Sequence, residues 1–200
     1  MKHGSRSGSP RHAVSLAHRV AGSVLREGDL AVDATAGNGH DTVFLARAVG
    51  AAGKVFAIDL QSAAIEATRA RLDAEGLSGR VVLRRGGHER LGTLLNEVDP
   101  GRVTVVMLNL GYLPGGDKTR ITRPATTLSG LNEALRLLAP GGVLTVVCYP
   151  GHPGGGEEAR EVRAWASALD AEPFRTFEDG ATGRSKTAPF LVAVKKNPDS

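Results

Sequence analysis

The chain has 200 residues, 41% of them hydrophobic and only 4% aromatic, with a formal net charge of +4 and an isoelectric point near 9.6. This length suits one domain with an aliphatic core that needs no disulfide or metal support. Cys148 is the only cysteine, which excludes an internal disulfide and a cysteine-based zinc site, and we expect no metal. The basic excess favours a polyanionic partner such as nucleic acid.

The first ten residues are polar and rich in Gly and Ser, unlike a signal peptide, and no apolar run is long enough to span a membrane. We therefore expect a cytoplasmic protein with no membrane partner. Residues 1–11 offer little to bury and are expected to be disordered. Residues 12–200 are expected to form a single domain.

Helical and strand-like segments alternate along this domain. Apolar residues recur at helical spacing over 12–25, a helix that would cover one edge of a sheet. Strands are expected at 30–33, 54–59, 81–83, 102–108, 143–149, 174–177 and 190–194. Further helices are expected at 42–47, 62–75, 88–98, 124–138 and 157–169, the fourth of these ending before Pro140-Gly-Gly.

This alternation predicts an α/β fold with a doubly wound, mostly parallel, seven-stranded sheet covered by helices on both faces, as in Rossmann-like proteins. No helix separates the last two strands, so we expect a hairpin with the last strand antiparallel. Ligands of such sheets bind outside the carboxyl ends of the strands, where the strand order reverses.

The turn after the first strand carries the main ligand-binding signal, D-A-T-A-G-N-G-H-D-T at 33–42. Its two glycines permit a tight turn and let a ligand lie on the main chain. Thr42 replaces the third glycine of a dinucleotide fingerprint, and Asp33 would repel a pyrophosphate. Asp59 ends the next strand and can accept both hydroxyls of a ribose. These acids suit a ligand with an amino-acid part and a ribose, whose ammonium Asp33 would reach directly or through water.

This turn and acid resemble motif I and the ribose-binding acid of class I S-adenosylmethionine (SAM)-dependent methyltransferases, with Thr35 replacing the usual first glycine. Together with N-L-G-Y-L-P-G-G-D-K at 109–118 and Y-P-G-H-P-G-G at 149–155, they resemble the rRNA methylase family over about 13–195. Known members of that family methylate 5-aminomethyl-2-thiouridine at the tRNA wobble position. The resemblance implies a SAM cofactor, a tRNA partner and the class I methyltransferase fold.

The resemblance also implies site residues. Cofactor contacts are expected from the glycine turn, the second and third strand ends and the start of the Asn109 loop, namely from Asp33, Thr35, Gly37, Asn38, Gly39, Asp41, Thr42, Asp59, Leu60, Gln61, His88 and Asn109. A helix-capping role for His88 is the alternative. Substrate contacts are expected from Gly111, Tyr112, Lys118, Arg120 and Arg123. Residues 122–124 depart from the usual I-T-T stretch of the family, which leaves the local substrate contacts open.

Methyl transfer to an amine requires a nucleophile held close to the methyl carbon and kept unprotonated. The catalytic candidates are Asn109, Tyr112, Tyr149 and His152. Asn109 stands where N-P-P-Y amino-methyltransferases have their asparagine and can accept a hydrogen bond from the amine. His152 can take up a proton or serve as a structural hydrogen bonder in its turn. Either tyrosine can stack on the pyrimidine.

The RNA-binding surface is expected from basic residues around the cleft, either as phosphate ligands or as an ordinary solvated surface. They are Lys118, Arg120, Arg123, Arg184 and Lys186. A second subunit would extend this surface, so a homodimer is a further expectation.

Other functions stay open from sequence. They are an rRNA or small-molecule methyltransferase, a non-catalytic nucleotide-binding module and a nicotinamide oxidoreductase. Asp33 and the missing third glycine argue against the oxidoreductase, and the loop that begins at Asn109 argues against a bare binding module.

Overall fold

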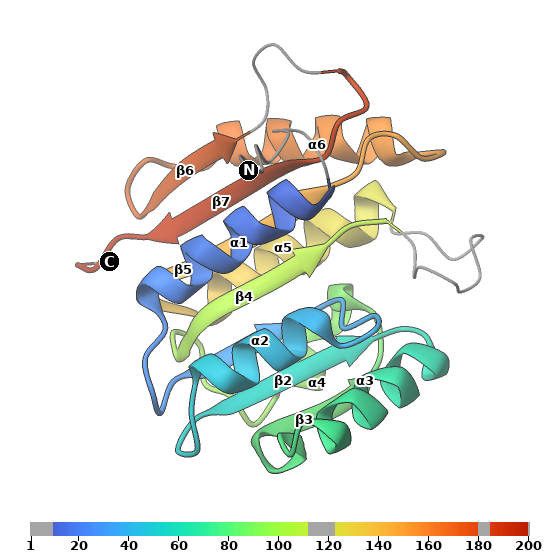
Figure 1. Cartoon of the computed structure of the whole chain (residues 1–200). Coiled ribbons are helices and arrows are strands. Elements are labelled where there is room, and N and C mark those ends of the chain that lie inside the picture. The colour runs from blue at the N-terminus through green and yellow to red at the C-terminus, as the bar shows by residue number, and fades with distance from the viewer. Residues whose placement is uncertain (1–9, 112–122, 180–184, 200) are drawn as a thin grey trace, which may run out of the picture.

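The computed structural model describes residues 10–111, 123–179 and 185–199. It is a seven-stranded sheet between two layers of helices (Figure 1). The strands are β1 (Leu30–Asp33), β2 (Lys54–Asp59), β3 (Val81–Arg85), β4 (Val103–Asn109), β5 (Leu138–Cys148), β6 (Phe174–Asp179) and β7 (Phe190–Lys196). The helices are α1 (Pro10–Val24), α2 (His40–Ala48), α3 (Ser62–Ala74), α4 (Leu91–Leu94), α5 (Pro124–Leu137) and α6 (Gly155–Ser167), with 3₁₀ turns η1 (Ser78–Arg80) and η2 (His88–Arg90).

The strand order is β3-β2-β1-β4-β5-β7-β6. Strands β1 to β5 pair in parallel, whereas β7 is antiparallel to both β5 and β6. The predicted fold class and the antiparallel last strand are therefore confirmed. The order reverses between β1 and β4, so the ends of these two strands mark the expected binding crevice. Asp33 pairs with Met107 there, two residues before Asn109.

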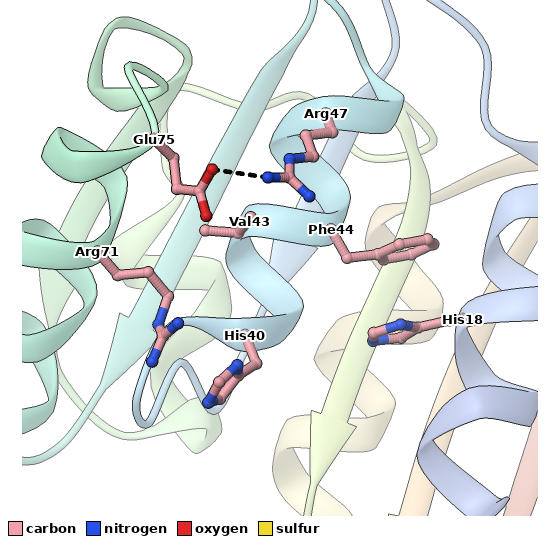
Figure 2. A pocket seen from close by; sticks show the side chains of 7 residues that line it. All are labelled: His18, His40, Val43, Phe44, Arg47, Arg71 and Glu75. Carbon is pink, nitrogen blue, oxygen red and sulfur yellow. Dashed lines mark hydrogen bonds and ion pairs between the residues drawn. The ribbon is translucent and has the colours of Figure 1, made fainter. Parts of the chain in front are cut away.

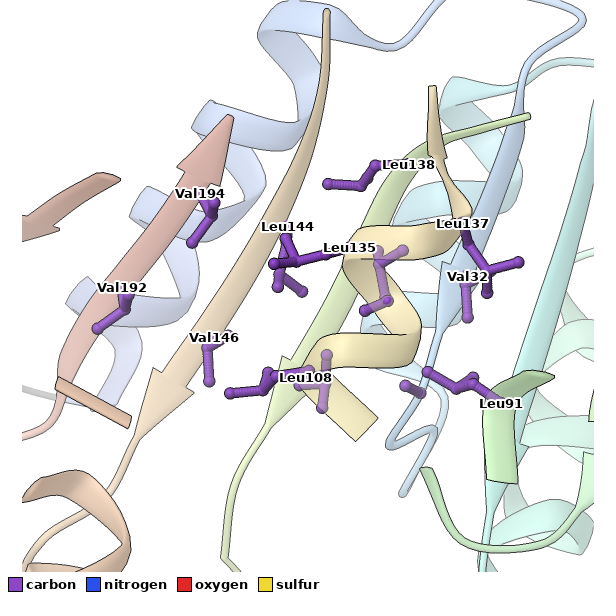
Figure 3. Packing of buried hydrophobic residues seen from close by; sticks show 14 of the residues in the cluster. Val32, Leu91, Leu108, Leu135, Leu137, Leu138, Leu144, Val146, Val192 and Val194 are labelled. Carbon is purple, nitrogen blue, oxygen red and sulfur yellow. The ribbon is translucent and has the colours of Figure 1, made fainter. Parts of the chain in front are cut away.

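The central strands are apolar on both faces because each face is covered by helices. On β4, Val105 and Met107 join the core under α1, α2 and α3, while Val106 and Leu108 join the core under α5 and α6. Figure 3 shows the second of these cores, where α5 packs across β1, β4 and β5. Among the described residues, no helix combines the length and apolar character needed to cross a membrane.

Some element boundaries differ from those predicted. Helix α1 begins at Pro10, inside the segment expected to be disordered, and residues 1–9 lie outside the described part of the chain. The helix predicted over 88–98 is divided into η2 and the short α4, and its apolar residues Leu91, Leu95 and Val98 are still buried.

Strand β5 begins at Leu138, five residues earlier than predicted, and includes the Pro140-Gly-Gly segment that was expected to lie between the helix and the strand. Its pairing with β4 is irregular between Val103 and Val105. Gly142 lies beside this irregularity, where a Cβ would be 2.9 Å from the carbonyl oxygen of Thr104. The glycines therefore let strand β5 continue beside β4 through a bulge, so that the strand does not end at this segment.

Leu108→Ala is expected to lower the free energy of unfolding by about 2–5 kcal/mol, because its side chain is 1% exposed in the central strand and its removal leaves a cavity. Urea denaturation measures the loss. Phe177→Ala is the control, since Phe177 is 53% exposed on β6, and it should cost less than about 1 kcal/mol. Equal losses would contradict the packing described.

Candidate functional site

The glycine turn at the end of β1 is shaped by left-handed backbone at Gly37 (φ 54°) and Gly39 (φ 79°). Gly39 also approaches α3 closely, because a Cβ there would lie 3.0 Å from the Thr68 Cα. Helix α3 holds the turn through two hydrogen bonds. The Thr68 hydroxyl donates to the Gly37 carbonyl at 3.1 Å, and Arg71 Nε donates to the Asn38 carbonyl at 2.6 Å.

Asp33 lies beneath this turn rather than facing an open cleft, with only 1% of its surface exposed. Its carboxylate accepts hydrogen bonds from the Thr35 backbone N–H at 3.2 Å and the Thr42 hydroxyl at 2.6 Å. Burial, followed by the negative charge of Asp41, raises the pKa of Asp33 from 3.8 to about 7. Contact with a ligand ammonium was expected, directly or through water, and in the structure the carboxylate supports the turn from below.

Asp59 ends β2 on the other side of the turn. One carboxylate oxygen accepts the Gly37 N–H at 2.9 Å, and the other accepts the Gln61 N–H at 2.9 Å. A carboxylate oxygen can accept more than one hydrogen bond, so both oxygens keep acceptor capacity. Asp59 is half-buried, and the neighbouring Leu60 is 53% exposed. A polar acceptor and an apolar surface therefore adjoin the glycine turn.

Asp41 and Asn109 join the glycine-turn side of the site to the end of β4. The Asn109 Nδ2 group donates to one oxygen of Asp41, and the Asn109 backbone N–H donates to the Thr35 hydroxyl at 2.7 Å. The other Asp41 oxygen lies 2.6 Å from His18 Nε2. Three predicted cofactor residues, Thr35, Asp41 and Thr42, thus have side chains engaged with other protein groups.

The loop after β5 approaches Asn109 at the end of β4. The Tyr149 hydroxyl lies 3.5 Å from Asn109 Oδ1, and burial raises the Tyr149 pKa to about 12. His152 Nδ1 is 2.9 Å from the Pro153 carbonyl, and a Cβ on Gly111 would lie 3.4 Å from His152 Nε2. The structure therefore brings together Asn109, Gly111, Tyr149 and His152, as predicted from the ends of β4 and β5.

His88 is buried on the other side of the sheet, between η2 and α5, where a Cβ on Gly130 would meet its ring at 2.6 Å. Its side chain caps neither η2 nor α4, and its Nε2 has no hydrogen-bond partner among the described residues. Burial lowers the His88 pKa, which favours the neutral ring. An adenine contact was expected, with a capping role as the alternative. The structure shows no cap, and the adenine contact stays a prediction.

The predicted basic rim is described only in part. Arg123, which precedes α5, and Lys186 are exposed. Tyr112, Lys118, Arg120 and Arg184 lie outside the described residues.

His18 lies in the helix predicted over 12–25, and the sequence did not indicate its contact with Asp41. Its ring stacks on Phe44, with centroids 4.0 Å apart and planes 4° from parallel, and it lines a groove of about 390 Å³ between α1, α2 and α3 (Figure 2). The available signal was a polar ring on the semi-buried side of an amphipathic helix, which does not identify its partner.

Comparisons with known proteins identify the family. A family model described as "Putative rRNA methylase" matches residues 55–195. The chain belongs to this family of methyltransferases. The predicted resemblance is therefore confirmed.

A curated relative from Arabidopsis thaliana, named tRNA (mnm(5)s(2)U34)-methyltransferase, chloroplastic, is 44% identical over 194 residues, which cover 93% of this chain and 70% of the relative. The structure of a protein from Clostridium thermocellum described as "putative rRNA-methylase" superposes with a TM-score of 0.86 at 38% identity and covers 92% of this chain and 97% of the other. A protein from Streptococcus mutans described as "a putative methyltransferase", in complex with SAH, superposes with a TM-score of 0.81 at 33% identity and covers 92% of this chain and 97% of the other.

The raised pKa of Asp33 predicts a pH dependence of stability. Asp33 binds a proton more tightly when folded, so its contribution is fully present below about pH 4 and is lost as the pH rises through 7. In the parent, this loss lowers the free energy of unfolding by at most about 1.4 kcal/mol per pH unit across that interval. Asp33→Asn should abolish this decline. Urea denaturation from pH 4 to 8 tests this, with the exposed Asp99→Asn as control. Identical pH slopes for the parent and Asp33→Asn would refute the assignment.

Proposed function

We propose that this protein is a SAM-dependent N-methyltransferase acting on the aminomethyl group of 5-aminomethyl-2-thiouridine at the wobble position of tRNA. The methyltransferase class follows from family membership and the fold. SAM as the cofactor is supported by the SAH-bound neighbour. The choice of tRNA and of the aminomethyl acceptor is supported by the name of the 44% identical relative.

The residues around the glycine turn fit SAM. Asp33, Asp41 and Asp59 place three carboxyl groups there, and the repulsion between them contributes to the raised pKa of Asp33. A ligand carrying a sulfonium and an ammonium relieves that repulsion, whereas a pyrophosphate would increase it. Asp59 has acceptor capacity for the ribose hydroxyls, and the exposed Leu60 offers an apolar surface to the base. SAM supplies the electrophilic methyl group.

The single observation that carries the proposal is the orientation of the Asn109 amide. A carboxylate only accepts hydrogen bonds, so Asp41 binds the Nδ2 end of Asn109 and leaves Oδ1 as the end available to another donor. An acceptor oxygen suits an amine, which can donate N–H to Oδ1 while its lone pair points toward the methyl carbon. Asp41 thus selects the amide orientation that binds an amine substrate.

The amine must also lose a proton before it attacks. The Pro153 carbonyl can only accept, so the neutral His152 ring carries its hydrogen on Nδ1, and its lone pair is on Nε2, on the side of Gly111. His152 is therefore the proposed proton acceptor. Tyr149, with its pKa near 12, stays protonated at neutral pH and donates to Asn109 or the substrate.

Recognition of tRNA is proposed to use the exposed cations near the acceptor side, of which Arg123 and Lys186 are described. A homodimer that extends this surface and a cytoplasmic location stay predictions. An rRNA substrate is the second candidate because the family description names rRNA.

Asp59→Ala is expected to weaken SAM binding by about 2–3 kcal/mol, on the order of a hundredfold. The change removes the ribose acceptor and also the bond that holds the Gly37 N–H. Calorimetry measures the affinity, and Glu66→Ala, an exposed carboxylate on α3, is the control. Unchanged affinity in Asp59→Ala, or tight NAD binding by the parent, would exclude the assigned role.

Asn109→Ala is expected to lower turnover about a hundredfold or more with SAM affinity nearly unchanged, because its amide acts on the acceptor amine in the transition state. Purified protein is incubated with SAM and tRNA carrying 5-aminomethyl-2-thiouridine, and methylated nucleosides are quantified by mass spectrometry. Asn96→Ala, an exposed asparagine, is the control. Methylation of rRNA but not tRNA by the parent would favour the second candidate, and full turnover in Asn109→Ala would remove Asn109 from the mechanism.

A further inference from the structure

His18 contacts Asp41, and the proposed mechanism does not use this contact. His18 lies on α1, which precedes the first strand, whereas Asp41 lies in the first turn of α2. The His18 and Asp41 side chains are 28% and 7% exposed, and their nearest polar atoms are 2.6 Å apart. A contact this short and this sheltered from water is stronger than an exposed ion pair.

The hydrogen-bonding capacities of Asp41, Asn109 and His18 determine which atoms carry the hydrogens. One Asp41 oxygen accepts from Asn109 Nδ2, and the other faces His18 Nε2, so His18 Nε2 carries a hydrogen when Asp41 is ionised. Stacking on Phe44 holds the plane of the imidazole. The Asp41 carboxylate is therefore held from both sides, by α1 and by the end of β4, and it cannot rotate without losing one of these bonds.

We propose that His18 is a positioning residue for methyl transfer, which holds Asp41 so that Asp41 keeps the Asn109 Oδ1 directed at the acceptor amine. The inference rests on the proposed function, because it assigns His18 to the reaction at Asn109. Without His18, Asp41 can turn toward water, and the Asn109 amide can flip or tilt away from the productive orientation. The cost then appears in turnover rather than in binding of the cofactor or of the tRNA.

The groove in Figure 2 provides both a control and a rescue. His40 lines the same groove and is exposed, and no hydrogen bond to Asp41 is recorded for it. His40→Ala therefore removes an imidazole from the groove without removing the one that holds Asp41. Because His18 itself lines this open groove, free imidazole can enter the space left in His18→Ala and restore a donor to Asp41.

The first experiment measures steady-state methylation of tRNA. His18→Ala should lower kcat roughly ten- to hundredfold, the size expected when one member of a coupled network is removed, with the tRNA KM and the SAM affinity within about twofold of the parent. Imidazole added at increasing concentration should raise kcat of His18→Ala and leave the parent and His40→Ala unchanged. An unreduced kcat in His18→Ala, or a reduced one that imidazole does not raise, would overturn the inference.

A second measurement does not depend on activity. The Asn109 side-chain NH₂ resonances are assigned by their loss in Asn109→Ala, and their exchange with water is followed by NMR. In His18→Ala these resonances should shift and exchange faster, and in His40→Ala they should match the parent. If they are unchanged in His18→Ala, the coupling is absent. If they change but the parent does not methylate tRNA, the coupling stands and the proposed function fails.

Discussion

The site depends on placing several carboxyl groups close together under a bare glycine turn. Asp33 is buried, and its pKa of about 7 reflects both that burial and the neighbouring acids. Each acid is held by hydrogen bonds from a different element: Asp33 by Thr42 of α2, Asp59 by the backbone of the turn, and Asp41 by groups from α1 and β4. The repulsion is thereby tolerated in the free protein, and a cationic ligand is favoured.

The fold was predictable because its signals are local. Apolar runs that end in Asp33, Asp59 and Asn109 mark three parallel strands, and the strand-end rule brings those residues to one crevice. The early start of β5 was not predictable in the same way. Proline and glycine usually interrupt a strand, and only contact with β4 shows that this backbone continues through an irregularity.

The sequence predicted which residues gather at the strand ends, but not the contacts between their side chains. The family resemblance placed Asp41 and Thr35 on the cofactor side, and in the structure their side chains bind Asn109. His18 gave no motif signal, because amphipathic spacing indicates which side of a helix is covered and not which group it meets. Hydrogen bonds between elements remote in sequence depend on exact tertiary placement, which one sequence does not contain.

The Asn109 contacts join segments that are distant in the sequence. The bond from Asn109 to Thr35 spans 74 positions of the chain, and the bond to Asp41 spans 68. Contacts of such separation require the loop between the two residues to close, which costs chain entropy. The segment from β1 to β3 contains the glycine turn and Asp59 but not Asn109. The groups proposed to bind SAM are therefore close in sequence, whereas those proposed to act on the acceptor amine come from β4 and from the loop after β5.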